Sequence, residues 1–434
     1  MGLKMNNFID IAKKCGYTYD EIKRLESGEA VISYRYIPTF EELTNVFSRA
    51  NDDIRRRRAE VFYNAPNILV RQRIGQGIHD RMEKILFSYG EPISKFDLEG
   101  MKKHQPHPVK FFSVQKMTVK QGECFDFSAK ADDFELPLGD DLLCCVNIGT
   151  LILEEGAGIC VKGNLLSLIC QKIIKKGSST EDILVLPTEF SYSPGYIPCN
   201  KNFDGTNGDD GRNGNNGQNR YTPQISNSIL GNFHFGDERG VKNGENGENG
   251  SNGDNGKKGL CGGAVKIAEI FINDIELHGN KPLFIKGKTG DGGRGGNGGN
   301  GGNGGNGGSA GGSYKVYSDK GEILIFKKGT SGNGGNGGDG GNGGNGGNGG
   351  ICSNIFVEVP SELYDKIVCV SEAGQGGVGG SGGKGGKGGL GYKNGIDGKK
   401  GGNGKNGHSR PGPPIYVNSV LYAQETIKKG STKK

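Results

Sequence analysis

The chain has 434 residues, of which 83 are glycine, and a formal net charge of +6. This glycine content is far above the usual share of about 7%, and the length predicts roughly two to four domains. The apolar content of 32% permits a core, but no run of about 20 apolar residues indicates a membrane-spanning helix. So mild a positive charge does not by itself indicate a nucleic-acid-binding protein.

Residues 1–103 have the pattern of helices. Apolar residues repeat on one helical face near the start, again over 19–25, and in a later stretch of roughly 68–87. Four consecutive arginines at 55–58 span more than one helical turn. We interpret them as a solvated, salt-bridged face, with a site for an anionic partner as the alternative. The sequence therefore predicts a helical N-terminal domain over 1–103 that anchors the protein or binds a partner.

Short apolar runs separated by glycine follow from about Val109 to Phe190. These runs are rich in Val, Ile and Leu and predict strands of a β-rich domain over 104–200. Adjacent Cys144 and Cys145 must point to opposite faces of a strand, and we interpret them as packing residues rather than a redox pair.

The ten cysteines form no CxxC pair, which predicts mostly free thiols in a reducing compartment. The first 21 residues contain no apolar stretch of the length found in secretory signals. We therefore expect synthesis in the cytoplasm without a signal peptide.

Glycine-rich runs dominate the predicted repeat domain, 201–425, which a basic tail, 426–434, follows. Three runs begin 42 residues apart, at Gly290, Gly332 and Gly374, and carry glycine in two columns of a three-residue repeat. Flanking runs near 205–217, 244–262 and 395–407 have one glycine column. The third column of the central runs is mostly polar and supplies the candidate binding surface: Asn297, Asn300, Asn303, Asn342, Asn345, Lys384 and Lys387.

A period of three matches neither an α-helix nor a strand, but it is the period of a polyproline-II-type helix. Such a helix leaves its backbone groups unpaired, so order requires neighbours, and glycine lets backbones approach closely. We therefore predict a bundle of polyglycine-II helices with the third column in solvent. A flexible linker is the main alternative. A collagen triple helix is disfavoured because the runs contain no proline.

Two topologies are compatible with the 42-residue spacing. In a solenoid, which we favour, each run is one side of a coil, so Asn297 lies over Asp339 and EILIF lies beside KIVCV. In the competing topology the runs alternate up and down, with strand pairs as hairpins at the two ends. The predicted fold is thus a helical N-terminal domain, an all-β region and a polyglycine-II helix and β-strand array, as a solenoid or a sandwich.

The runs GGNGGNGGNGGNGG and GGVGGSGGKGGKGG resemble the glycine-rich motifs of bacteriophage long-tail-fibre tip adhesins, and less closely the glycine-rich antifreeze protein of springtails. The first resemblance implies a bundle whose loops contact a bacterial receptor, and a place on a virion. No catalytic, cofactor or metal constellation stands out. We expect a non-catalytic scaffold or adhesin, or alternatively an intracellular assembly protein that recruits a partner through 1–103. Expected partners are a protein or surface-glycan receptor and further copies of the chain, without specific nucleic acid or membrane insertion.

Overall fold

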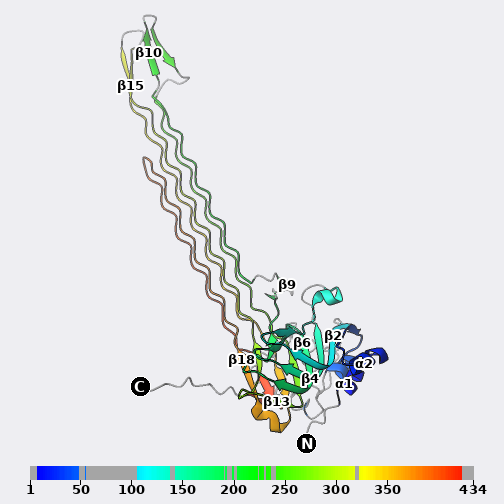
Figure 1. Ribbon diagram of the computed structural model, residues 1–434. Helices are drawn as coiled ribbons and strands as arrows, with labels where there is room; N and C mark the ends of the chain where they lie inside the picture. The colour runs from blue at the N-terminus through cyan, green and yellow to red at the C-terminus, as the bar shows by residue number, and fades with distance from the viewer. Residues whose placement is uncertain are drawn as a thin grey trace, which may run out of the picture.

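The computed structural model describes residues 7–47, 54, 105–136, 142–189, 191–192, 198–199, 203–222, 224–228, 231–235, 241–317 and 322–422. It consists of a β-sheet base and a long shaft of glycine-rich segments that projects from the base, with β10 and β15 at the far end (Figure 1).

Two sheets form the base. The first sheet has the order β1 (Val31–Ile37), β2 (His107–Val119), β4 (Leu143–Leu153), β6 (Leu165–Lys175), β12 (Ala268–Ile272), β17 (Ile355–Glu358), β19 (Ile415–Val417) and β20 (Val420–Leu421), with β13 (Ile275–Leu277) also beside β6. The second has the order β18 (Ile367–Glu372), β14 (Leu283–Lys288), β7 (Ile183–Leu186), β5 (Gly158–Lys162) and β3 (Cys124–Asp126). Pairing is parallel except for β1 with β2 and β19 with β20.

The main core lies between the two sheets. Apolar side chains such as Val146 and Leu166 of the first sheet and Ile183 and Ile285 of the second belong to one buried cluster. Alternate residues of the first sheet point to its other face, because side chains alternate along a strand. Cys144 accordingly lies in the cluster between the sheets, and Cys145 lies in the cluster on the opposite face.

Within the described residues 7–47 the structure has three short helices: α1 (Phe8–Lys14), α2 (Tyr19–Glu26) and α3 (Phe40–Phe47). Residues of α1 and α2, including Ile11 and Leu25, share a buried cluster with Phe111 of β2 and Ile169 of β6. The helices therefore cover the outer face of the first sheet. Short 3-10 helices occur at Ala131–Phe134 and Ser361–Lys366.

The predicted helical N-terminal domain is not seen. Residues 31–37 form β1, which pairs with β2, because its residues are mostly β-branched or aromatic and alternate with polar ones from Ile32 to Tyr36, with the period of a strand. The arginines at 55–58 and the stretch 68–87 lie outside the described residues.

Six glycine-rich rods build the shaft. We number them in chain order: rod 1 (205–217), rod 2 (244–262), rod 3 (290–308), rod 4 (332–350), rod 5 (374–389) and rod 6 (395–407). Backbone hydrogen bonds link neighbouring rods at every third residue, as in Gly295 N–H to the Val378 carbonyl at 2.8 Å and Gly335 N–H to the Gly305 carbonyl at 2.8 Å. Glycine is required at these contacts, because a Cβ on Gly335 would lie 1.9 Å from the Glu248 carbonyl oxygen.

Successive rods run in opposite directions. Gly296 bonds to Lys257 while Gly299 bonds to Asp254, so rods 2 and 3 are antiparallel. Rods 1, 3 and 5 are parallel to one another, and so are rods 2, 4 and 6. Rods 3 and 4 form the middle, each bonded to four other rods.

The base explains this order. Rods 3 and 5 follow the neighbouring parallel strands β14 and β18, and rods 4 and 6 lead into the neighbouring parallel strands β17 and β19. Parallel neighbours lie about 4.8 Å apart, so the chain leaves and re-enters the base at adjacent places each time. The shaft is thus three long hairpins inserted between strands of the second and the first sheet.

The favoured solenoid is wrong, and the alternating topology describes the shaft. The solenoid would place Asp339 next to Asn297, but the parallel neighbour of Asn297 is Ser381, and Asp339 belongs to an antiparallel rod. EILIF contains β16 (Ile323–Phe326), which pairs with β15 (Tyr314–Tyr317), whereas KIVCV belongs to β18 in the base. Parallel neighbours are therefore two runs apart in sequence, 84 residues for Leu283 beside Ile367 and 87 for Asn246 beside Asn333, because two oppositely directed runs are needed to return to the base. The strands of 201–425 extend the sheets of the preceding region, since β12 pairs with β6 and β14 pairs with β7.

Candidate binding surfaces of the shaft

Two antiparallel hairpins lie at the far end of the shaft, which we call the tip (Figure 1): β10 (Gln224–Ser228) with β11 (Gly231–Phe235), and β15 with β16. A third small pair, β8 (Ser191–Tyr192) with β9 (Pro198–Cys199), lies nearer the base. Tyr314 and Phe326 stack at 4.7 Å between ring centroids across β15 and β16.

The tip presents an exposed apolar strand. Ile323, Leu324 and Ile325 of β16 are 54%, 46% and 63% exposed. Because successive side chains on a strand point to opposite faces, both faces of this two-stranded ribbon carry apolar groups. Exposed Lys315 and Lys327 lie at its margins. Contiguous exposed apolar side chains rimmed by polar residues are typical of protein interaction sites.

Five of the predicted site residues are asparagines, and all five are used inside the shaft. The side-chain oxygens of Asn297, Asn300 and Asn303 accept backbone N–H groups of rod 5 at 2.8 to 2.9 Å. Those of Asn342 and Asn345 accept the backbone N–H groups of two rod 6 residues, Gly402 and Lys405, at 2.7 and 2.8 Å. These side chains are exposed, as predicted, but they also link rods.

The same ladder of caps joins the other parallel rods. Asn and Asp side chains from Asp204 to Asn219 cap rod 3, and those from Asn243 to Asn255 cap rod 4. A short side chain with an acceptor oxygen is needed here, since lysine carries donors only. This explains the preference for Asn, which sequence reasoning attributed to solvent exposure alone.

The parallel rods form two rows, 1-3-5 and 2-4-6, and rods 5 and 6 are the last members of these rows. Their outward positions do not show the preference for Asn or Asp. Their outward columns read Gln375, Val378, Ser381, Lys384, Lys387, Leu390 and Lys393, Ile396, Lys399, Gly402, Lys405, His408. Among the described residues no further parallel rod lies beyond them, so these positions have no N–H group to cap. Lys384 and Lys387 therefore lie at a free edge, and the ammonium of Lys387 is 2.7 Å from the carboxylate of Asp397.

A second ladder joins rod 6 to rod 5 in antiparallel order. Asn394, Asp397, Asn403 and Asn406 cap backbone N–H groups of rod 5 or its turn at 2.9 to 3.2 Å. The remaining position in this column, opposite Gly385, is Lys400. Because the lysine side chain has no acceptor, it cannot supply the cap that its neighbours supply.

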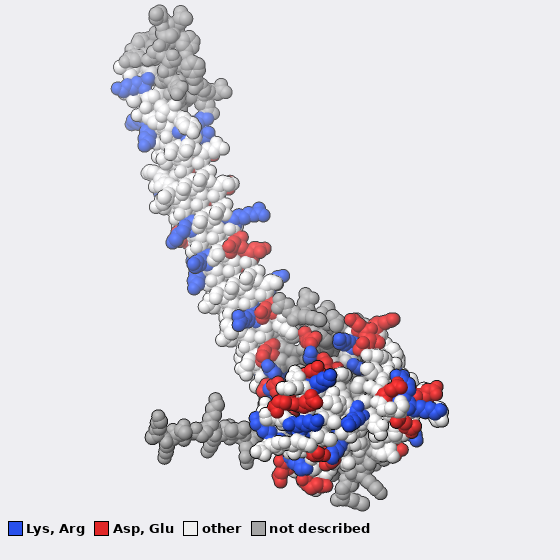
Figure 2. All heavy atoms as spheres, viewed as in Figure 1, with Lys and Arg blue, Asp and Glu red and all other residues white. Residues whose placement is uncertain are grey.

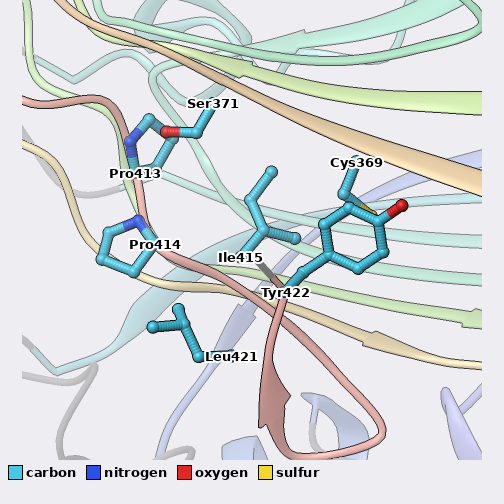
Figure 3. Close-up of a pocket in the computed structure, with 7 residues that line it drawn as sticks. All are labelled: Cys369, Ser371, Pro413, Pro414, Ile415, Leu421 and Tyr422. Carbon is cyan, nitrogen blue, oxygen red and sulfur yellow. The ribbon is translucent and has the colours of Figure 1, made fainter. Parts of the chain in front are cut away.

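A small pocket of about 230 Å³ lies in the base, lined by Cys369, Ser371, Pro413, Pro414, Ile415, Leu421 and Tyr422 (Figure 3). Its volume is below the range of about 300–1,000 Å³ usual for ligand sites. Burial raises the pKa of the Cys369 thiol to about 12, which disfavours the reactive thiolate. The pocket is thus a packing gap between the ends of β18 and β19 rather than a catalytic site.

No disulfide joins any of the nine cysteines whose side chains are described, in agreement with the expectation from the sequence. Within the described part of the chain, no cluster of His, Cys, Asp and Glu side chains could hold a metal ion. None of the described helices is both long and apolar enough to cross a membrane.

Comparisons with protein-family models, with curated proteins and with solved structures find no match for this chain.

Proposed function

We propose that the protein is a non-catalytic scaffold or adhesin that holds its tip at a distance from its base, so that the tip contacts a receptor. The receptor is a protein or a surface glycan. The observation that carries this proposal is the separation of base and tip by a continuous, hydrogen-bonded shaft (Figure 1).

The shaft is suited to hold the tip at a fixed distance from the base. Rods 3 and 4 are bonded to four neighbours at every third residue, and side-chain caps add further bonds between parallel rods. A rod of 19 residues rises about 59 Å at about 3.1 Å per residue. Ordering glycine costs more conformational entropy than ordering any other residue, so many hydrogen bonds are needed to hold the rods straight. This large number of bonds is consistent with a stiff spacer.

The tip is the best candidate for the receptor contact. It combines three consecutive exposed apolar residues, Ile323 to Ile325, with adjacent lysines. Most of the shaft surface elsewhere is asparagine, glycine and lysine, and its exposed apolar side chains, such as Val378 and Ile396, are single residues of rods 5 and 6 rather than three in a row on a strand. The apolar faces of α1 and α2 are buried in the base core.

The alternative function, assembly through the glycine array, finds less support. A parallel rod added beyond rod 5 would need acceptor side chains on rod 5, by analogy with Asn300 on rod 3. Val378, Lys384 and Leu390 occupy such positions and cannot accept a hydrogen bond. Self-association stays a prediction from the sequence.

A graft tests the proposal without disturbing the shaft. Gly332 N–H donates to the Gly308 carbonyl at 2.8 Å, and Gly395 N–H donates to the Gly389 carbonyl at 2.8 Å. The last hydrogen bond before the connection is therefore equivalent in rods 3 and 4 and in rods 5 and 6. The five residues 390–394 that join rods 5 and 6 can therefore replace 309–331, which include β15 and β16.

The wild type and the graft are compared on a glycan microarray and against a displayed library of surface proteins. The proposal predicts that ligands of the wild type are lost by the graft. A double variant that keeps the ribbon, Leu324→Ser with Ile325→Ser, should lose them in part. Equal binding by the graft and the wild type would place the receptor site elsewhere and contradict the proposal.

A further inference from the structure

A strongly basic edge runs along one side of the shaft. Between Gly374 and Arg410 the chain has seven basic residues and a single carboxylate, Asp397. The basic residues, which we call the basic edge, are Lys384, Lys387, Lys393, Lys399, Lys400, Lys405 and Arg410. The net charge of this segment equals the +6 of the whole chain, so the positive and negative charges of the remaining residues cancel. Figure 2 shows basic side chains at successive levels along the shaft.

The lysines of the basic edge are exposed and mostly unpaired. All six are in the exposed class, and within the described residues only Lys387 forms an ion pair with a carboxylate. The opposite edge, rods 1 and 2, is different. Both acidic and basic residues lie there, and Glu245, for example, pairs with Arg220. The charge is therefore concentrated on one edge rather than spread over the shaft.

The bundle geometry gathers three of these lysines. Gly398 N–H donates to the Gly386 carbonyl, and Gly401 N–H donates to the Gly383 carbonyl. Lys399 and Lys400 of rod 6 are therefore level with Lys384 of rod 5. From the level of Arg410, beside Gly374, to the turn at Lys393, the basic edge extends for about 53 Å at about 3.1 Å per residue.

Shaft stability does not account for these lysines. The outward column of rod 5 has no N–H group to cap, so lysine is not required there. Lys400 occupies a column in which Asn403 and Asn406 cap rod 5 at 3.0 and 2.9 Å, and lysine forgoes that bond. Lys400 thus occupies a position where asparagine would add a hydrogen bond to the shaft, at the same level as Lys384 and Lys399.

We propose that the basic edge binds a linear anionic polysaccharide, with carboxylate or sulfate groups along its chain. A long, straight row of exposed cations matches a long, straight row of anions. Proteins that bind single-stranded nucleic acid also use aromatic side chains on which bases stack. The segment 374–410 has one such residue, Tyr392, at the turn. Recognition by charge alone therefore favours a polysaccharide over a nucleic acid.

The test uses the full-length chain and heparin as the probe, with poly(U) as the nucleic-acid arm and neutral dextran as the uncharged arm. The edge variant carries Lys384→Asn, Lys399→Asn and Lys400→Asn. The control carries Arg212→Asn, Lys257→Asn and Lys258→Asn, which removes the same charge from exposed positions on rods 1 and 2. Hydrogen exchange of the shaft verifies that both variants are folded.

We expect the edge variant to bind heparin at least about tenfold more weakly at moderate salt, with a shallower salt dependence, because charge contacts release counterions. The control should change little. Equal loss in the two variants would mean that net charge alone drives binding, and unchanged binding by the edge variant would remove the site. Binding to poly(U) tighter than to heparin would overturn the polysaccharide. The 390–394 graft should still bind heparin, so this proposal and the tip proposal can fail separately.

Discussion

Two neighbouring glycines of rod 6 should respond oppositely to the same substitution. A Cβ on Gly401 would lie 2.0 Å from the Gly341 carbonyl oxygen of rod 4, whereas a Cβ on Gly402 would meet only the Asn342 side-chain oxygen, at 3.4 Å. Gly401→Ala should therefore force rod 6 away from the bundle. Gly402→Ala should be tolerated, and it serves as the matched control one residue away.

The expected size follows from the bonds near Gly401. Relieving a 2.0 Å contact requires a shift of more than 1 Å, which breaks bonds such as Gly401 to Gly383 and Gly343 to Gly402, each 2.9 Å. Two or three bonds at about 0.5–1.5 kcal/mol each, with about 1 kcal/mol of remaining strain, give roughly 2–5 kcal/mol. Gly402→Ala should instead stabilise by about 0.4–1 kcal/mol, by restricting the unfolded chain.

Hydrogen exchange measured by mass spectrometry on peptides from 374–410 reads this difference locally, because exchange reports the free energy of local opening. Gly401→Ala should accelerate exchange roughly 30- to 4,000-fold, at about tenfold per 1.4 kcal/mol. Gly402→Ala should leave exchange unchanged or slow it. Equal exchange in the two variants would refute the claim that glycine is required by contact between rods.

Three further changes have defined outcomes. Asn300→Ala removes the 2.9 Å cap on the Lys384 amide and should cost about 1 kcal/mol, seen as faster exchange of that amide by NMR; unchanged exchange would show that the caps contribute nothing. The ammonium of Lys175 lies 2.6 Å from the buried carboxylate of Asp182, and Lys175→Ala leaves that carboxylate without its cation. The free energy of unfolding, measured by chemical denaturation, should fall by about 3–5 kcal/mol, and a fall below about 1 kcal/mol would contradict this. Burial raises the pKa of the Cys144 thiol to about 12, so iodoacetamide at pH 8 should label it only after denaturation, and rapid labelling of the native protein would count against the buried placement.

The glycine columns could be predicted from sequence because their cause is local. Two columns on rods 3 and 4 imply two close neighbours, and a Cβ on Gly298 or Gly299 would indeed lie about 2.0 or 1.9 Å from carbonyl oxygens of two different rods. The outward exposure of Asn297 follows from the same reasoning.

The direction of the rods could not be predicted in this way, since parallel and antiparallel neighbours both satisfy a three-residue period. It is set by strands that pair far apart in sequence, such as β14 with β18. One signal was present: apart from Arg294, the third column is Asn or Asp where a parallel rod follows, and it changes to residues such as Lys384 and Val378 where none does. β1 was missed because helical periodicity on both sides of it was extended across an alternating strand pattern.

The central claim is that the shaft separates the tip from the base, and a single distance tests it most directly. Fluorescent labels are introduced through non-canonical amino acids at Leu324 on β16 and Tyr364 in the base, which are 46% and 44% exposed. Single-molecule energy transfer should give more than about 60 Å, since the 21 steps from residue 329 to 350 rise about 65 Å at about 3.1 Å each. A separation of about 15 Å or less, which stacked coils would require, would contradict the account.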